Sequence, residues 1–279
     1  MTQTILRPNF TKNIHQHYIK KGKSLNIFGA KGVGKSRFIE DLKSLIGNDT
    51  NFVSLNMVSL GNDYKLFLKR LKEKLSIKDE SINSVELVLS KFARKQGKKL
   101  LVIDDFEYLF RDYHDKKFNL SFLDELNSFK NREDVSLIIL STHNYKHYPL
   151  YNDNELRPSP LDINIKEITP MMEEEIVDEL KRDIKIDLGF DLLATMIMGK
   201  DYPYSFIRFI IEEIDFGNYR KDDFLERNFD RWEKGFKKTY RISWYLILKK
   251  YIQKFFNSLT LITLLDIIKE VLPWEKKKG

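Results

Sequence analysis

The most constraining feature of this sequence is a complete phosphate-binding loop at residues 29–36, which reads Gly-Ala-Lys-Gly-Val-Gly-Lys-Ser. In this pattern, G-x-x-x-x-G-K-[ST], the glycines let backbone N–H groups wrap an anion, the lysine meets the phosphates and the hydroxyl reaches Mg²⁺. A short apolar run precedes the loop and an amphipathic helical pattern follows it, so that a helix N-terminus faces the phosphates. The residues that we predict to contact nucleotide are Gly29, Ala30, Lys31, Gly32, Val33, Gly34, Lys35, Ser36 and Arg37.

Composition limits the class of protein. The chain has 279 residues, 42% hydrophobic and 32% charged, which is enough apolar material for a core and excludes bulk disorder. It has no cysteine, which excludes a disulfide framework and a thiolate metal site. We see no apolar N-terminal signal segment and no run of about 18 uncharged apolar residues. We therefore expect a cytoplasmic protein without a membrane partner.

The periodicity along residues 1–168 predicts an α/β domain. Besides the strand at 24–29, apolar patterns predict strands at 51–57, 98–105, 135–142 and 162–168, separated by helices at 37–46, 64–75, 85–94 and 118–129. Residues 145–160 contain three prolines, which predicts a loop. Strands that alternate with helices favour a mostly parallel five-stranded sheet covered on both faces. After Pro170 the pattern turns helical, and we expect residues 169–215 to form a helical lid.

A second chemical signal follows the strand at 98–105, which ends in two carboxylates. A hydrophobic strand that ends in an acid, downstream of a phosphate loop, is a Walker B element. We expect Asp104 to hold Mg²⁺ together with Ser36, and Asp105 to orient or deprotonate the attacking water. Glu107 is the rival base; Asp105 is favoured because it directly follows the metal ligand.

The strand at 135–142 ends in Ser-Thr-His-Asn, a third polar cluster. Thr142 or Asn144 can reach the γ-phosphate from this position, whereas ordinary capping or a turn is the alternative. We expect His143 to be a surface turn residue. The five histidines include one pair at His-x-x-x-His spacing, His143 and His147, but Asn144 stands where a His-Glu-x-x-His motif has glutamate, so we expect no catalytic zinc site.

The span from about Pro8 to Ile214 resembles the AAA+/STAND branch of P-loop ATPases, in particular the archaeal-type, initiator-like and transposition-regulator ATPases. The matching features are residues 29–36, 103–105, 140–142, 168–175 and the Gly199–Pro203 pair before an apolar helix. This glycine and proline are further apart than is usual in the family, and His143 stands where its members often have arginine or asparagine. The resemblance implies Mg²⁺-dependent ATP hydrolysis between sheet domain and lid, used as a switch or assembly timer.

The same resemblance raises the question of an arginine that completes the site from a neighbouring subunit. Arg157 and Arg132 are the candidates for such a finger, and Arg208 can instead act from the lid of the same chain. Each has the alternative role of an ordinary surface or salt-bridged arginine, because arginine is mostly exposed. A finger from another subunit would require a homo-oligomer.

The last segment, residues 216–279, is basic and rich in aromatic residues. It holds 15 Lys and Arg against 8 Asp and Glu, which accounts for the whole net charge of +7. We expect a helical region, with a winged-helix fold as an open alternative. Its lysines and arginines alternate with aromatic residues. Among the latter, Phe229, Trp232, Phe236 and Tyr240 form a stripe at helical spacing. We therefore expect an ATP-dependent switch that acts with nucleic acid; the alternative is a signalling or defence ATPase that controls self-assembly or a protein partner.

Overall fold

The structure is a computed structural model that describes residues 5–60, 63–110, 117–142, 144, 149–152, 155–158, 161–200, 202–221 and 223–239. The chain divides into two compact units, Met1–Asp215 and Phe216–Gly279. The boundary that we predict between residues 168 and 169 falls inside the first unit and stays a prediction.

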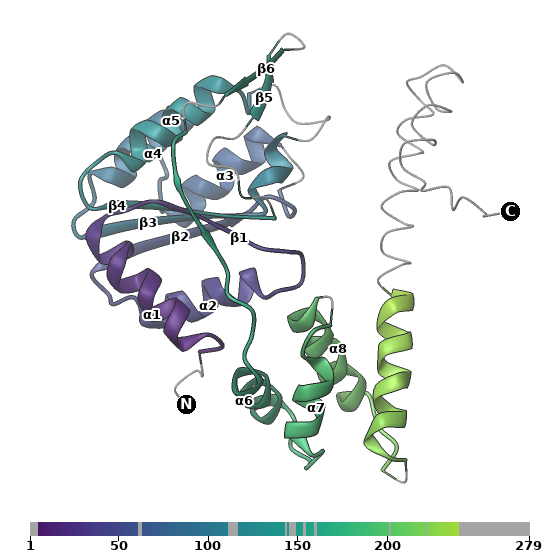
Figure 1. The fold of residues 1–279 in the computed structure, drawn as a ribbon. Helices are drawn as coiled ribbons and strands as arrows, with labels where there is room; N and C mark the ends of the chain where they lie inside the picture. Colours follow the sequence, from purple (N-terminus) through teal and green to yellow (C-terminus); the bar gives the residue numbers. More distant parts are fainter. Residues whose placement is uncertain are drawn as a thin grey trace, which may run out of the picture. The chain divides into compact units, whose positions relative to one another are not determined.

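A five-stranded parallel sheet forms the centre of the first unit, in the order β2-β3-β4-β1-β7 (Figure 1). The strands are β1 (Leu25–Phe28), β2 (Thr50–Asn56), β3 (Lys98–Asp104), β4 (Val135–Ser141) and β7 (Asn164–Glu167). The predicted α/β class and five-stranded sheet are therefore confirmed. Strand β4 lies between β1, which leads into the phosphate loop, and β3, which ends in Asp104. Because these strands are parallel, the phosphate loop and Asp104 lie at the same edge of the sheet.

Helices cover both faces of this sheet, as its continuous apolar strands require. Helices α1 (Pro8–His17) and α2 (Lys35–Leu45) pack on one face, and α3 (Tyr64–Lys74), α4 (Val85–Ala93) and α5 (Leu120–Lys130) pack on the other (Figure 1). Along β3 the side chains alternate between these two cores. Leu101 and Ile103 join the α3–α5 side, whereas Leu100 and Val102 join the α1–α2 side. Two short 3₁₀ helices, η1 (Ile19–Lys21) and η2 (Phe106–Phe110), complete this part.

The predicted loop at residues 145–160 is wrong in part. Strands β5 (Pro149–Asn152) and β6 (Glu155–Pro158) pair there as an antiparallel hairpin. Pro149 and Pro158 lie opposite each other at the open end of the hairpin, where proline is tolerated because strand ends need fewer N–H donors. The prolines therefore mark the limits of two strands rather than a loop.

Three helices follow the sheet where the lid is predicted: α6 (Glu173–Asp183), α7 (Phe190–Ile197) and α8 (Pro203–Asp215). Their apolar faces meet in a small core, to which Leu180, Leu193 and Ile210 contribute fully buried side chains. In the second unit, residues 225–239 form a helix. None of the helices in the described parts of the chain has the length and apolar character that a bilayer crossing needs.

Candidate nucleotide and magnesium site

The phosphate loop connects β1 to α2 with the backbone that its glycines permit. Gly32 and Gly34 have φ angles of 78° and 95°, in the left-handed region that other residues avoid. The loop is fixed to the sheet because the Gly29 N–H donates to the Ser141 carbonyl at 3.2 Å. The loop residues predicted from sequence therefore lie together at the carboxyl edge of the sheet, where ligands bind in open α/β folds.

Lys35 is the first residue of α2 and its side chain is buried inside this loop. Its ammonium donates to the carbonyl oxygens of Gly29 at 2.7 Å and Ala30 at 3.0 Å. Burial lowers the pKa of Lys35, and the charges of Glu107, Asp105 and Asp104 act in the opposite direction. The arrangement places one cation beside three carboxylates, at the spot where phosphate oxygens would replace the two carbonyl contacts.

The two predicted magnesium ligands face each other. The Ser36 hydroxyl donates to Asp104 Oδ2 at 2.9 Å, and the Asp105 N–H donates to Asp104 Oδ1 at 3.0 Å. Burial raises the pKa of Asp104, partly offset by these hydrogen bonds and by one from Asn56. A desolvated carboxylate beside a hydroxyl is an oxygen donor pair of the kind that Mg²⁺ prefers.

Asn56, at the end of β2, is a site residue that the sequence analysis missed. Its Nδ2 donates to Asp104 Oδ2 at 3.2 Å and to Asp105 Oδ2 at 3.0 Å. Asp105 has a φ of 55°, which turns the chain out of β3 into η2. Burial and the neighbouring charge of Asp104 raise the pKa of Asp105. Asn56 thus positions Asp105, the residue that we favour as the base. The sequence signal that could have identified Asn56 is its place at the end of a strand, because polar residues at the ends of parallel strands share one edge of the sheet.

Glu107 and Thr142 form a pair across the same edge. Glu107 Oε1 accepts from the Thr142 hydroxyl at 2.8 Å and from its N–H at 3.2 Å. Glu107 Oε2 is buried without a hydrogen-bond partner among the described residues. The Thr142 hydroxyl therefore donates to Glu107 in this structure. The predicted contact of Thr142 with the γ-phosphate would require this hydrogen bond to break. Asn144 is exposed, and His143 lies outside the described residues.

Arg37 differs from the other predicted nucleotide contacts. Its side chain is 4% exposed and forms ion pairs with Asp41 at 3.3 Å and with Glu179 of α6 at 3.6 Å. These ion pairs direct the guanidinium toward α2 and the lid helix α6. The predicted contact of Arg37 with nucleotide is therefore confined to its backbone N–H, in the first turn of α2, and stays a prediction.

We expect Asp41 to make the stability of the protein depend on pH. Burial raises its pKa from 3.8 to about 6, so the folded state binds this proton more tightly than the unfolded chain. The resulting stabilisation is complete below about pH 4 and is lost as the pH rises through 6. Between pH 4.5 and 7.5, the free energy of unfolding of the parent should fall by about 2 kcal/mol relative to Asp41→Asn. Urea unfolding of both proteins measures this; a constant difference would contradict it.

The lid contacts the phosphate loop directly. The Ser205 N–H, in the first turn of α8, donates to the Gly32 carbonyl at 3.1 Å. A Cβ at Gly32 would lie 2.6 Å from Tyr202, so only glycine fits beneath this residue. The structure thus brings the Gly199–Pro203 region, which carries part of the family resemblance, to the phosphate loop.

Arg7, the residue before α1, is a second element that the sequence analysis missed. Its guanidinium is buried and donates to the Val33 carbonyl at 2.6 Å and to the Thr169 carbonyl at 2.7 Å. It therefore joins the phosphate loop to the segment that enters the lid. Nothing in its sequence context, a Leu-Arg-Pro tripeptide, distinguishes it from a surface arginine.

Two of the three arginine-finger candidates have partners within the chain. Arg208 forms an ion pair with Asp183 of α6, and Arg132 donates to the Ser90 hydroxyl at 3.0 Å. Arg208 is therefore occupied within the lid rather than directed at the phosphates. Arg157 belongs to β6, and its side chain lies outside the described part of the structure.

Comparison with known proteins agrees with this geometry. Residues 18–148 match the family described as AAA domain. No curated protein matches the chain. Among solved structures, a Walker-type ATPase of Pyrococcus abyssi is similar at 12% identity and a TM-score of 0.60, over 91% of this chain and 77% of that one.

Two further similar structures are complexes with DNA. The ORC1 protein of Aeropyrum pernix matches at 12% identity and a TM-score of 0.53, over 83% of this chain and 66% of that one. Drosophila ORC matches at 12% identity and a TM-score of 0.53, over 82% and 61%. The chain thus spans less than two thirds of the length of both, and at this identity the likeness shows the fold. Residues 18–148, which match the AAA domain family, hold both the phosphate loop and the carboxylates that face it.

Proposed function

We propose that this protein is a Mg²⁺-dependent ATPase that works as a molecular switch on nucleic acid. The observation that carries the proposal is the constellation of Lys35, Ser36, Asp104 and Asp105 at one edge of the sheet. Phosphoryl transfer requires mainly positioning and charge neutralisation, and these four residues supply a cation, a metal-binding pair and a base. The lid contact with Gly32 supplies an element that ATP can displace or hold.

The donor set fits Mg²⁺ held jointly with ATP. Within the described ranges, no group of three or more His, Cys, Asp or Glu side chains forms a metal site of its own. Mg²⁺ is usually bound by one or two protein oxygens together with substrate phosphates and waters, which matches Ser36 and Asp104. Bound there, Mg²⁺ would neutralise charge on the β- and γ-phosphates. We expect Mg²⁺-dependent binding of ATP to require both Ser36 and Asp104.

The nucleic-acid part of the proposal rests on charge. The solved complexes of Aeropyrum pernix ORC1 and Drosophila ORC with DNA share this fold, and residues 216–279 hold the net charge of +7. In the helix at 225–239, Arg227, Lys234, Lys237 and Lys238 are exposed. Phe229, Trp232 and Phe236 of the aromatic stripe are buried, so they pack inside the protein and are not available to stack on nucleobases. Tyr240 and Arg241 lie outside the described residues. The exposed lysines and arginine of this helix favour binding of nucleic acid through its phosphates rather than by stacking on its nucleobases.

We expect the affinity of this basic segment for DNA to fall steeply with salt. The variant Lys237→Ala/Lys238→Ala/Arg241→Ala should lower the slope of log affinity against log salt by up to about 3, at roughly 0.9 for each phosphate that is no longer neutralised. Lys237 pairs with Glu233 at 2.7 Å, so we expect Lys237 to contribute less to the change in slope than the other two residues. Fluorescence anisotropy with a mixed-sequence duplex measures the slope. ATP affinity should be unchanged, because the variant leaves the phosphate loop intact.

A single set of measurements tests the function as a whole. We expect ATP turnover that EDTA abolishes, and DNA affinity that differs between the ATP-bound and ADP-bound protein. Light scattering after size exclusion, with and without ATP and DNA, reports the predicted oligomer. Turnover without any DNA binding, together with ATP-dependent self-assembly, would support the signalling hypothesis instead.

A further inference from the structure

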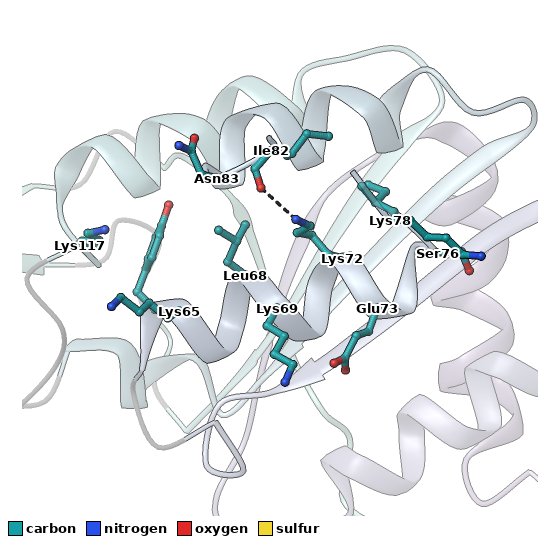
Figure 2. Close-up of a pocket in the computed structure, with 12 residues that line it drawn as sticks. Lys65, Leu68, Lys69, Lys72, Glu73, Ser76, Lys78, Ile82, Asn83 and Lys117 are labelled. Atoms are coloured by element: carbon teal, nitrogen blue, oxygen red, sulfur yellow. Dashed lines mark hydrogen bonds between the residues drawn. The ribbon is translucent and has the colours of Figure 1, made fainter. Parts of the chain in front are cut away.

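A second basic surface lies on the ATPase domain itself, along α3. A groove with a volume of about 780 Å³ opens between α3, the loop that follows it and the segment before α5. Figure 2 shows Lys65, Lys69 and Lys72 spaced along α3, with Lys117 at one end of the groove and Lys78 at the other. We call these five residues and the space that they line the lysine groove.

The positive charge of the lysine groove is not cancelled by the acids around it. Glu73 is the one acid among the described residues that line the groove, and Arg70 pairs with it at 2.9 Å. Asp79, in the loop after α3, pairs with Lys91 at 3.0 Å and accepts from the Ser81 hydroxyl at 2.6 Å. Glu73 and Asp79 are therefore engaged with groups other than the five lysines.

Three of the five lysines make no polar contact within the described part of the chain. Lys65, Lys69 and Lys78 are exposed and have no ion pair or hydrogen bond there. Lys72 donates to the Ile82 carbonyl at 3.1 Å, and Lys117 lies over the Tyr64 ring at 5.3 Å. The groove thus combines two cations that have contacts within the chain with three exposed ones that have no polar contact in the described structure, an arrangement that suits an anion with charges repeated along its length.

The chemistry of the lining favours a nucleic-acid strand. In the part of the chain that the structure describes, no arginine lines the groove, so the planar, two-bond recognition of single carboxylates is missing. Lysines act as point charges and suit phosphates that follow one another along a backbone. The floor contains Leu68, Ile77 and Ile82, which offer apolar contact to sugars and bases. A positively charged groove that follows the backbone is how proteins bind single strands without sequence preference.

We propose that the lysine groove binds the sugar–phosphate backbone of a single nucleic-acid strand, independently of base sequence. This rests on the proposed function in that nucleic acid is the partner, but it places a contact on the AAA domain, separate from residues 216–279. The groove involves none of the residues of the nucleotide site.

The test compares two triple variants of the full chain. Lys65→Ala/Lys69→Ala/Lys78→Ala removes the three exposed cations of the groove that make no polar contact in the described structure. Lys12→Ala/Lys43→Ala/Lys166→Ala is the matched control, since these lysines are exposed on α1, α2 and β7. The probe is a fluorescein-labelled (dT)20 oligonucleotide, followed by anisotropy from 50 to 300 mM salt. The groove variant should lower the salt slope by up to about 2, at roughly 0.7 for each phosphate of a single strand that is no longer neutralised.

The control variant should change this slope by less than half as much, and both variants should keep the ATP turnover of the parent. Equal slopes for the two variants overturn the proposal. So does a groove variant that alters binding of a 20-base-pair duplex or of poly-L-glutamate but not of (dT)20. The variant at residues 237, 238 and 241, measured in parallel, separates the proposals. If it alone loses affinity, the groove proposal fails and the proposed function stands; if the parent binds no nucleic acid, both fail.

Discussion

Lys35→Ala should lower ATP affinity by roughly 30- to 1,000-fold, equivalent to about 2–4 kcal/mol. The ammonium of Lys35 is buried in the phosphate loop, with Gly29 and Ala30 carbonyls as its partners in place of phosphate. Its removal would leave Asp104 and Asp105 without the cation that offsets their charge, so a polyanion would meet net negative charge. Isothermal calorimetry with ATP and Mg²⁺ measures the loss.

Lys43→Ala is the matched control for this prediction. Lys43 is an exposed lysine on the same helix, two turns beyond the phosphate loop, and its removal should leave ATP affinity within a factor of about two. Circular dichroism establishes that both variants are folded. A folded Lys35→Ala protein with the affinity of the parent would remove the phosphate loop from the proposed site.

The sheet and the phosphate loop were predictable because local chemistry determines them. Strands β1, β3 and β4 are buried on both faces and show as apolar runs, and the phosphate loop needs its residue types at fixed spacing. The hairpin at β5 and β6 was missed because its prolines lie at strand ends, where the same residues also predict a loop. Helix α1 buries few apolar residues, chiefly Phe10 and Ile14, which is too weak a pattern to predict.

The site residues that escaped prediction act through tertiary contacts. Arg7 reaches Val33 and Thr169 across 26 and 162 residues of sequence, and Asn56 reaches Asp104 across 48. Arg37 follows the phosphate loop directly, yet its guanidinium turns to Asp41 and Glu179 because both carboxylates are buried beside it. Sequence spacing predicts which side chains can share an edge, whereas packing decides which of them pair.

Asp105→Asn should bind ATP with near-normal affinity but hydrolyse it about 10²–10⁴-fold more slowly, the usual contribution of a general base. The asparagine keeps the shape of Asp105 and its contact with Asn56, but it cannot take a proton. Asp104→Asn should instead weaken Mg²⁺-dependent binding, because that carboxylate faces Ser36. Single-turnover hydrolysis and ATP binding, measured on the same preparations, separate the two effects.

Glu107→Gln is the decisive counterpart, because two acids compete for the role of base. Glu107 Oε1 is held by Thr142, while its buried Oε2 has no partner in the described structure, so it too is placed to act on water. We still expect the smaller loss here, since Asp105 is adjacent to the metal-binding Asp104 and its pKa is raised by burial and by that charge. If Asp105→Asn retains full turnover while Glu107→Gln loses it, the base is Glu107, and the Thr142 contact is what positions it.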